Sequence, residues 1–475
     1  MPYTLAIDQG GHASRAIVFD HQGRLIAKAE AAIQTHTPQS GWVEHDAEKL
    51  VAATRQAIEQ AVAQLGADKR HLQAAGLATQ RSSIACWDRL TGRPLGPILS
   101  WQDRRQAEWL EQFSPQRRQI HDSTGLFLSP HYGASKLRWC LDHLPEVSQA
   151  AQAGTLAMGP LASFLTWQLL AERPLVADPA NASRTLLWNL QRGDWDDQLL
   201  QLFQIPRQAL PACVSSRGDF GHLAVDDLRL PLQVITGDQP GALFAWGRPD
   251  PALAYITLGT GAFIQRPMAT PLMHERLLSG IGHRDAEQSW YTLEGTVNGA
   301  ARALHWYAQR HGIADIETCV AQALASDEPP ALFINSVAGL GSPDWISDLE
   351  PRFEGNDSRF GQLRGVIESI AFLIQRNLDT MAQVVTAPER IIISGGLSRL
   401  DDLCQAIADL SGVTVMRPGE CEATARGLAW LLTAPAPAWG MPEPLSYFNP
   451  RSDAGILSRY RHWERRMAQL RTDKT

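Results

Sequence analysis

The sequence contains few cysteines, and their spacing matches neither a disulfide framework nor a zinc site. Only six occur among 475 residues, and no Cys-x-x-Cys pair is present. Disulfide-rich secreted domains and zinc ribbons depend on closely spaced cysteines, so both classes are excluded. We expect buried free thiols, because unpaired cysteine packs as a small apolar residue. The six are Cys86, Cys140, Cys213, Cys319, Cys404 and Cys421.

The chain also lacks an excess of positive charge. It has 43 lysines and arginines against 50 aspartates and glutamates, which gives a formal net charge of -7. Proteins that bind nucleic acid gain much of their affinity by neutralising phosphates with basic side chains. The charge balance therefore argues against a nucleic-acid partner.

No long hydrophobic run is present. The most apolar stretch, residues 159–171, is interrupted by Ser163, Thr166 and Gln168, whereas a membrane helix needs about 20 apolar residues. The N-terminus reaches Asp8 before the apolar core of a secretory signal can form. We therefore expect a cytoplasmic protein with no membrane partner.

The composition is that of a folded protein with more than one domain. Hydrophobic residues make up 44% of the chain and charged residues 20%, with 15 tryptophans. Long disordered stretches are excluded by this balance. At about 150 residues per domain, the length predicts two or three domains.

A strand, a glycine-led turn and a second strand occur twice. Apolar runs flank residues 8–11 near the N-terminus and residues 259–261 in the second half. This repetition predicts a duplicated architecture. The strands are expected at residues 4–7, 16–19, 25–27, 254–258 and 262–265.

Helices alternate with these strands. Apolar spacing over residues 46–65 predicts an amphipathic helix with Asp46 as its N-cap. A long apolar stripe predicts another helix over residues 363–381, and a strand-like run at residues 390–394 follows it. Alternating helices and strands predict an α/β fold.

The best candidate for a domain boundary is residues 246–251. Two prolines and a glycine there end the preceding apolar segment, because proline does not continue a helix. This boundary predicts domains at residues 1–246 and 247–475. Too few residues follow the Pro-rich stretch at 434–444 for a third domain, so we expect a tail that crosses back over the body.

The two glycine turns are candidates for phosphate binding. Backbone N–H groups converge on an anion only where no Cβ intrudes, and Asp8, Ser14, Arg15 and Thr260 lie in or beside the turns. A carboxylate at such a place suits hydrated Mg²⁺. The alternative is a purely structural hairpin turn. Neither turn carries the P-loop or the Rossmann glycine pattern.

Asp238 is the candidate general base. It follows an apolar run at residues 232–235, which places it at the end of a predicted strand. Open α/β sheets bind ligands at the carboxyl ends of their strands, where a carboxylate can accept a proton. A plain helix N-cap is the alternative.

Taken in order, these and other segments resemble the FGGY carbohydrate kinases, and within that family the glycerol kinases most of all. The resemblance implies two domains of the actin and hexokinase type, each built on a ribonuclease H-like core. It also implies ATP, Mg²⁺ and a small polyol or sugar in the cleft between the domains. The resemblance leaves the oligomeric state open, and a homodimer and a larger homo-oligomer are both among the alternatives. The ten matches cover residues 6–10 with 14–20, 41–46, 79–81, 101–105, 181–185, 237–239, 259–261, 293–295, 339–343 and 395–399.

The resemblance implies roles for single residues. Asp238 matches the base that takes the proton of the acceptor hydroxyl, and Asp8 matches the carboxylate that contacts Mg²⁺ through water. For Trp101 and Phe263, core packing is the alternative role. The implied nucleotide-binding residues are Asp8, Gly10, Gly11, Ser14, Arg15, Gly259, Thr260, Gly261, Gly395 and Gly396. The implied acceptor-binding residues are Arg81, Ser82, Trp101, His131, Asp238, Gln239 and Phe263.

The chain departs from the glycerol kinases at both sites. Ser82 stands where they have Glu, and His131 stands where they have Tyr, so we expect an acceptor larger or differently hydroxylated than glycerol. Residues 11–13 lack two threonine hydroxyls of the family's first turn. The alternative function is a catalytically weak relative kept as a ligand-binding or regulatory protein. Retention of Asp8 and Asp238 favours an enzyme.

Overall fold

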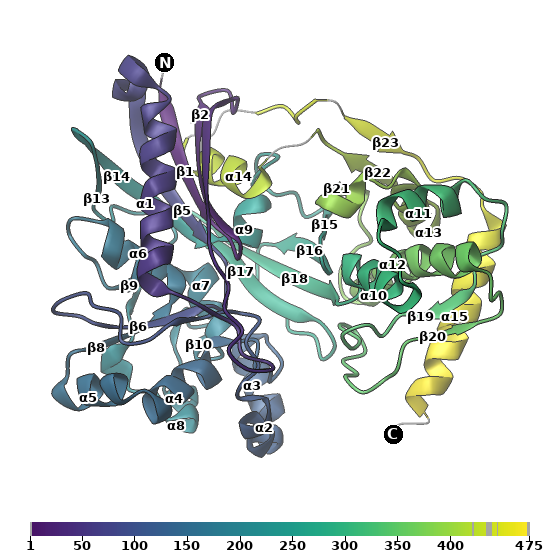
Figure 1. The fold of residues 1–475 in the computed structure, drawn as a ribbon, viewed down its shortest axis with the longest axis horizontal. Coiled ribbons are helices and arrows are strands. Elements are labelled where there is room, and N and C mark those ends of the chain that lie inside the picture. Colours follow the sequence, from purple (N-terminus) through teal and green to yellow (C-terminus); the bar gives the residue numbers. More distant parts are fainter. Residues whose placement is uncertain (1, 420–421, 434–438, 444, 473–475) are drawn as a thin grey trace.

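In the computed structural model, the chain forms two α/β halves that lie side by side (Figure 1). The structure describes residues 2–419, 422–433, 439–443 and 445–472. Each half is built around one large sheet, with helices packed against it. The α/β class predicted from alternating helices and strands is confirmed.

The first half contains a six-stranded sheet in the order β13-β14-β5-β1-β2-β3. Neighbours β14, β5 and β1 are parallel, whereas β1, β2 and β3 are antiparallel. The first predicted strand–turn–strand unit is therefore β1 and β2. The strands are β1 (Tyr3–Gln9), β2 (Ala13–Asp20), β3 (Leu25–Ala32), β5 (Leu72–Thr79), β13 (His222–Val225) and β14 (Leu228–Gly237).

The second half contains a seven-stranded sheet in the order β17-β18-β16-β15-β21-β22-β23. Neighbours β15, β21 and β22 are parallel, whereas β15, β16 and β18 are antiparallel. The series β18-β16-β15-β21-β22 thus repeats β3-β2-β1-β5-β14 in order and direction, which confirms the predicted duplication. The strands are β15 (Leu253–Leu258), β16 (Ala262–Met268), β17 (Leu278–Arg284), β18 (Ser289–Val297), β21 (Arg390–Ser394), β22 (Thr414–Arg417) and β23 (Ser446–Phe448).

Shorter strands form four small sheets around these two. A four-stranded sheet in the first half consists of β4 (Glu44–His45), β7 (Ile98–Leu99), β6 (Ile84–Asp88) and β8 (Leu156–Pro160). The pairs are β9 (Val176–Ala177) with β12 (Ala212–Cys213), β10 (Trp188–Asn189) with β11 (Asp194–Trp195), and β19 (Leu332–Ile334) with β20 (Arg352–Glu354).

The two helices predicted from apolar spacing are present. α1 (Ala47–Ala63) begins after Asp46, whose side chain accepts a hydrogen bond of 3.0 Å from Lys49 N. α12 (Arg359–Met381) is capped by Ser358 in the same way. Both bury their apolar faces in the cores of their halves.

The other helices surround the sheets. They are α2 (Ala107–Leu110), α3 (Arg117–Thr124), α4 (Gly133–His143), α5 (Pro145–Ala153), α6 (Leu161–Leu169), α7 (Pro179–Ala182), α8 (Asp197–Phe203), α9 (Asp238–Ala242), α10 (Ala301–His311), α11 (Ile316–Leu324), α13 (Asp401–Ser411), α14 (Ala423–Leu432) and α15 (Ala454–Thr472).

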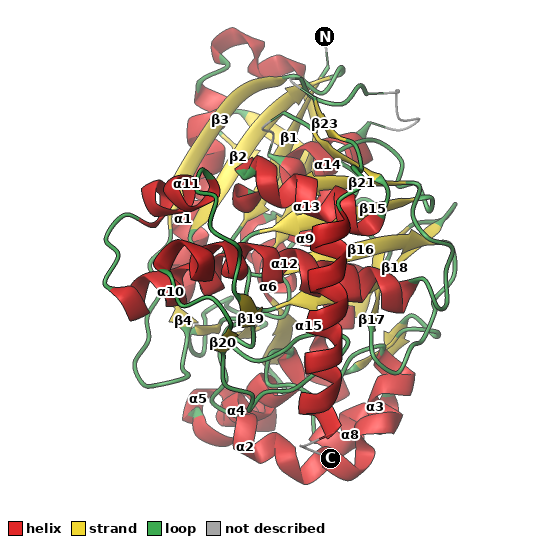
Figure 2. Cartoon of the chain, turned by 90° about the vertical axis from the view of Figure 1, so that its right-hand side faces the viewer, coloured by secondary structure: helices red, strands yellow, loops and turns green. Residues whose placement is uncertain are grey.

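The C-terminal segment touches both halves, as expected of a tail that crosses back over the body. Trp439 Nε1 donates to His21 O at 3.2 Å in the first half, while β23 pairs with β22 and α15 runs down the face of the second half (Figure 2). Residues 434–438 and 444 of the predicted Pro-rich stretch lie outside the described residues.

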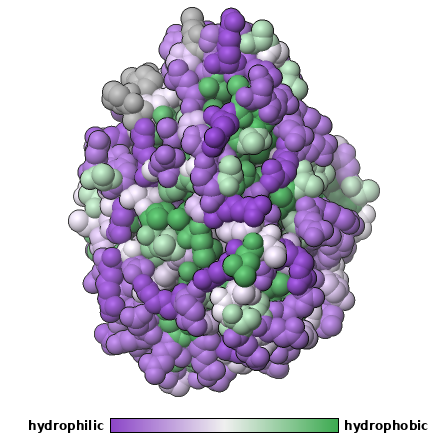
Figure 3. Space-filling view, turned by 90° about the vertical axis from the view of Figure 1, so that its left-hand side faces the viewer, coloured by the Kyte–Doolittle hydropathy of each residue, from purple (hydrophilic) through white to green (hydrophobic). Residues whose placement is uncertain are grey.

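The described cysteines are free, and most are buried. Cys86, Cys140, Cys319 and Cys404 are buried and Cys213 is half-buried, while Cys421 lies outside the described residues. Among the helices that the structure describes, none is long and apolar enough to cross a membrane. On the face seen in Figure 3, hydrophilic residues predominate and hydrophobic residues form small patches between them.

Candidate functional site

Three of the candidate residues lie at the ends of neighbouring parallel strands. Asp8 lies near the end of β1, Arg81 follows β5 and Asp238 follows β14. These three strands are adjacent and parallel in the first sheet, so their carboxyl ends meet at one edge. Open α/β sheets bind their ligands at this edge.

Asp8 is a buried carboxylate at this edge. It is 6% exposed, and its Oδ2 lies 3.6 Å from Nη1 of Arg15, its partner across the β1–β2 hairpin. Burial, together with the charges of Asp238 and Glu422, raises the pKa of Asp8 to about 7, although Arg15 opposes the shift. A carboxylate in this setting becomes easier to ionise when a cation binds beside it.

Neutralising Asp8 should stabilise the protein at high pH. Because the pKa of Asp8 is raised on folding, its contribution to stability is complete below about pH 4 and is lost as the pH rises through about 7. We expect Asp8→Asn to raise the free energy of unfolding by roughly 2–3 kcal/mol at pH 8 and by much less at about pH 4.5. Urea unfolding at both pH values measures the effect, and an equal gain at the two would contradict it.

The first glycine turn leaves room for a ligand. Gly10 N donates to Ala13 O at 3.0 Å, which closes the turn. A Cβ added at Gly10 or Gly11 would meet no neighbouring atom closer than 3.5 Å. Gly11 and Trp101 also line a cavity of about 220 Å³. An open backbone beside a cavity fits the binding of a phosphate group.

Ser14 does not present its hydroxyl to this turn. Successive side chains of a strand point to opposite faces, so Ser14 points away from the face that carries Arg15. Its Oγ is buried and shares a hydrogen bond of 2.8 Å with Thr54 Oγ1 of α1. The expected nucleotide contact from the Ser14 side chain is therefore corrected, because this hydroxyl joins β2 to α1.

The second glycine turn is attached to the start of α10. Ala301 N donates to Gly259 O, and Arg302 N donates to Thr260 O, both at 3.1 Å. Gly259 N also donates to Gly261 O at 2.8 Å. These bonds hold the turn in place, while Thr260 stays exposed at its tip.

Gly395 and Gly396 follow β21, beside the second turn. Gly395 has a φ of +91°, and a Cβ there would lie 2.3 Å from Leu258 O at the end of β15. Only glycine allows the two backbones to approach so closely. A Cβ at Gly396, by contrast, would meet nothing within 4 Å. The pair leaves an open backbone surface next to the second turn.

Arg81, Gln239 and Asp238 form one cluster. Arg81 Nη2 donates to Gln239 Oε1, and Gln239 N donates to Asp238 Oδ1 at 2.9 Å. Burial raises the pKa of Asp238, against the opposing charge of Arg81. The N-cap of α9 is Gly237, and Asp238 is the first residue of the helix. The plain N-cap interpretation of Asp238 is therefore wrong.

Ser82, Trp101 and His131 form a second group of candidate acceptor-binding residues. The ring centroids of Trp101 and His131 are 5.3 Å apart. Lys136 Nζ donates to the carbonyl oxygens of Ser82 at 2.8 Å and of His131 at 2.7 Å, which holds the two segments together. The Ser82 hydroxyl is buried and has no hydrogen-bond partner among the described residues. Such a group fits a pocket that binds a polar ligand.

Phe263 lies on a strand of the second half, whereas these clusters belong to the first half. It is half-buried on β16, opposite Thr296 of β18. The ring contacts and hydrogen bonds within the described part of the chain do not join it to Arg81 or Trp101.

Two charged residues in this region had no expected role. Lys136 joins the segments of Ser82 and His131 through hydrogen bonds to their carbonyl oxygens. Glu294 of β18 forms ion pairs with Arg81 and Arg184. Glu294 is the only charged residue of β18. A single acid within an otherwise apolar and hydroxylated strand is the signal that could have identified it.

Sequence comparisons agree over nearly the whole chain. The profile of the FGGY family of carbohydrate kinases, N-terminal domain, matches residues 3–230, and that of the C-terminal domain matches residues 254–434. A glycerol kinase from Trichlorobacter lovleyi is 36% identical over 99% of this chain and 97% of its own. One from Alcanivorax borkumensis is 36% identical over 91% of this chain and 89% of its own.

Solved structures share the fold. A crystal structure of Plasmodium falciparum glycerol kinase with ADP has a TM-score of 0.89 at 22% identity, over 99% of this chain and 98% of that one. A xylulose kinase from Rhodospirillum rubrum has a TM-score of 0.87 at 18% identity, over 98% and 99%. The expected two-domain fold is confirmed. The chain belongs to the FGGY family of carbohydrate kinases and is a kinase that phosphorylates a hydroxyl group of a sugar or polyol.

Proposed function

We propose that the protein transfers a phosphoryl group from ATP to a hydroxyl of a small polyol or sugar, with Asp238 as general base and Mg²⁺ as cofactor. The convergence of Asp8, Arg81 and Asp238 at one sheet edge supports this best. Phosphoryl transfer is accelerated mainly by positioning and charge neutralisation. The proposal takes residues 1–246 and 247–475 as the two domains.

Asp238 and its neighbours act on the acceptor. Asp238 takes the proton of the attacking hydroxyl, while Arg81 and Gln239 orient the acceptor beside it. The hydrogen bonds among these three residues support this assignment. A carboxyl with a raised pKa accepts a proton more readily than an ordinary one.

Asp8 holds hydrated Mg²⁺ in this proposal. Mg²⁺ in phosphoryl-transfer sites binds through one or two carboxylates, phosphate oxygens and several waters. The ion would neutralise phosphate charge, and it would favour the ionised form of Asp8.

The glycine turns bind the nucleotide. Gly11, Thr260 and Gly261 contact phosphates through backbone N–H groups, together with Arg15. Gly10 and Gly259 shape the two turns, because their own N–H groups donate to Ala13 O and Gly261 O. Residues 395–396 lie under the adenine. The open Cβ positions at Gly10, Gly11 and Gly396 support this assignment, because an added side chain would occupy the space that the ligand needs.

The proposal is tested by measuring ATP consumption with a panel of acceptors. Glycerol, erythritol, xylitol and D-xylulose span three to five carbons and two oxidation states. Product analysis by mass spectrometry must show the phosphorylated acceptor. ATP hydrolysis without any phosphorylated acceptor, on a panel extended to hexoses, would contradict the proposal.

We expect larger acceptors to be preferred over glycerol. Ser82 is too short to replace a glutamate, and a buried hydroxyl left without an acceptor costs about 1–3 kcal/mol. Burial and the charges of Lys136 and Arg184 hold the pKa of His131 well below its usual range, so its neutral ring both donates and accepts a hydrogen bond. The pocket therefore offers space and polar contacts to an acceptor of about four carbons or more.

Restoring the glycerol kinase residues tests this preference. We expect Ser82→Glu combined with His131→Tyr to shift the ratio of kcat/KM values toward glycerol by about tenfold per regained hydrogen bond, at roughly 1.4 kcal/mol each. The two single variants show whether both positions contribute. The idea is lost if the unmodified protein already uses glycerol better than every larger acceptor.

A further inference from the structure

A buried carboxylate of the second half joins two arginines of the first half. Glu294 on β18 forms an ion pair with Arg184, and its Oε1 lies 3.9 Å from Nη1 of Arg81. Thr292 Oγ1 donates to the same carboxylate at 2.7 Å. The contact thus links strand β18 to the segments that follow β5 and α7.

All three charged groups are withdrawn from solvent. Glu294 is 3% exposed, Arg184 is 5% exposed and Arg81 is 8% exposed. Although burial opposes ionisation, the charges of Arg184 and Arg81 hold the pKa of Glu294 below its usual value. Because water is largely excluded here, the two positively charged guanidinium groups would repel each other if the carboxylate did not lie between them.

Arg81 is held from two sides. Its Nη2 donates to Gln239 Oε1, next to Asp238, while Nη1 faces Glu294 without a hydrogen bond. The guanidinium is therefore oriented by one residue of the first half and one of the second.

We propose that Glu294 is a positioning residue, which holds Arg81 in place for the acceptor and makes the acceptor site depend on how the two halves sit together. The proposal rests on the proposed function in taking Arg81 as an acceptor contact. In this proposal Glu294 does not touch the acceptor and acts through Arg81, with which it forms an ion pair.

A structural role for Glu294 must be separated from a positioning role. A structural role requires only that the two buried arginine charges be balanced. In that case any substitution that restores charge balance should restore both stability and acceptor binding. If Glu294 positions Arg81, restored balance recovers stability alone.

The first experiment uses Glu294→Gln, which keeps the shape and removes the charge. We expect KM for the best acceptor of glycerol, erythritol, xylitol and D-xylulose to rise at least tenfold. We expect KM for ATP to stay within about twofold and kcat to fall less than KM rises, because the base and the nucleotide turns are unchanged. Unchanged KM for the acceptor would overturn the proposal.

The second experiment removes one charge of each sign with Arg184→Met and Glu294→Met together. Replacing buried ion pairs with apolar side chains of similar size often restores stability. We expect the melting temperature to recover toward that of the unmodified protein, while KM for the acceptor stays raised. Recovery of both quantities would overturn the positioning role, and so would recovery of KM alone.

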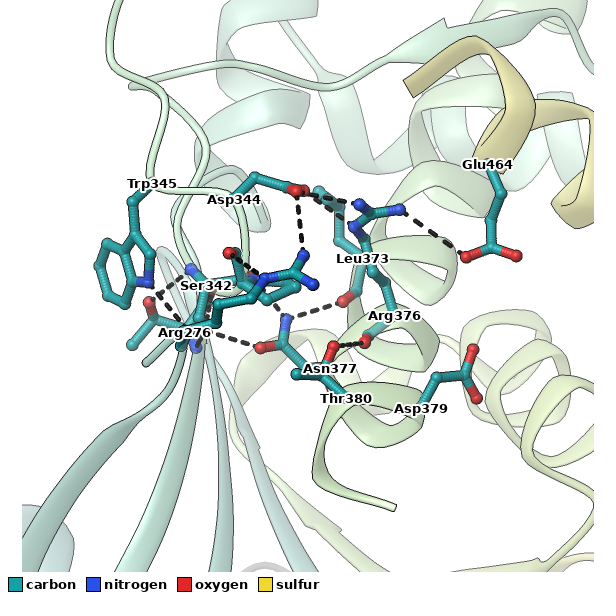
Figure 4. Close-up of polar contacts among 12 residues, drawn as sticks. Arg276, Ser342, Asp344, Trp345, Leu373, Arg376, Asn377, Asp379, Thr380 and Glu464 are labelled. Carbon is teal, nitrogen blue, oxygen red and sulfur yellow. Dashed lines mark hydrogen bonds and ion pairs between the residues drawn. The ribbon is translucent and has the colours of Figure 1, made fainter. Parts of the chain in front are cut away.

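A second acid between two arginines provides a matched control. Asp344 Oδ2 lies 2.8 Å from Nε of Arg376, and its Oδ1 lies 3.6 Å from Nη2 of Arg276 (Figure 4). The side chain of Asp344 is 1% exposed. Asp344→Asn should therefore lower stability as Glu294→Gln does and leave KM for the acceptor unchanged. A similar rise in KM would show that destabilisation alone explains the effect.

Calorimetric binding of the same four acceptors separates this proposal from the proposed function. Binding requires no phosphoryl transfer, so it reports on Arg81 directly. Binding by the unmodified protein without transfer would overturn the proposed function alone. Equal binding by the unmodified protein and Glu294→Gln would overturn the positioning role alone, and no binding by the unmodified protein would count against both.

Discussion

Replacing Asp238 by Asn should lower kcat by about two orders of magnitude or more, the usual contribution of a general base. Asn keeps the size of the side chain and can still accept the 2.9 Å hydrogen bond from Gln239 N, but it cannot take a proton. Arg81 and Gln239 remain in place, so we expect acceptor affinity to change by less than about threefold. Steady-state kinetics with the best acceptor and calorimetry of acceptor binding measure the two quantities.

The control for this variant is another buried aspartate at a helix start. Asp196 caps α8 and accepts from Gln198 N at 3.0 Å and from Leu199 N at 3.2 Å. Asp196→Asn should change stability by less than about 1 kcal/mol, because Asn caps a helix about as well as Asp, and it should leave kcat within about twofold, since it lies outside the proposed site. Near-normal turnover of Asp238→Asn would disprove the base.

The pH dependence offers a second check on the base. Burial raises the pKa of Asp238 above its ordinary value. The ionised form is the base, so kcat of the unmodified protein should rise with pH through that raised pKa. The acidic limb should disappear from the residual activity of Asp238→Asn.

The main sheets were predictable where local signals are strong. Glycines mark the turns at residues 10–11 and 259–261, and apolar runs flank both turns, so the two hairpins could be read from the sequence. α1 was equally clear, because Asp46 precedes a regular apolar stripe. These features depend on neighbours within a few residues.

The direction of the Ser14 side chain follows from the strand itself. Asp8 and Arg15 are partners across the β1–β2 hairpin, so they lie on the same face of the sheet. Because side chains alternate along a strand, Ser14 must point to the other face, where it meets Thr54. Alternation alone could have corrected its expected role.

The Glu294 contacts could not be derived from local patterns. Glu294 lies 110 residues from Arg184 in the sequence, and nothing near either residue indicates that they meet. The pair forms because β17, the neighbour of β18 in the second sheet, packs against α7 of the first half, and Arg184 follows directly after α7. Such contacts depend on how the two halves pack, which composition and spacing do not encode.

Replacing Gly395 by Ala should destabilise the protein by about 3–5 kcal/mol and raise KM for ATP at least tenfold. The backbone at Gly395 has φ +91° and ψ 169°, a region open essentially to glycine and costing other residues about 1–3 kcal/mol. The added Cβ would also lie 2.3 Å from Leu258 O, so β15 and β21 must move apart where the nucleotide is proposed to bind. Overpacking of this kind costs about 1–3 kcal/mol more. Acceptor affinity should change little.

Gly412→Ala is the matched control, because it separates backbone strain from close approach. Gly412 ends α13 with φ +72°, and a Cβ there would meet nothing within 4 Å. It should cost about 1 kcal/mol, the usual penalty for a left-handed alanine, without changing KM for ATP. Chemical unfolding and ATP titration of both variants measure these effects. If Gly395→Ala loses no more stability than Gly412→Ala and keeps its KM for ATP, the close approach of the two strand ends does not shape the nucleotide site.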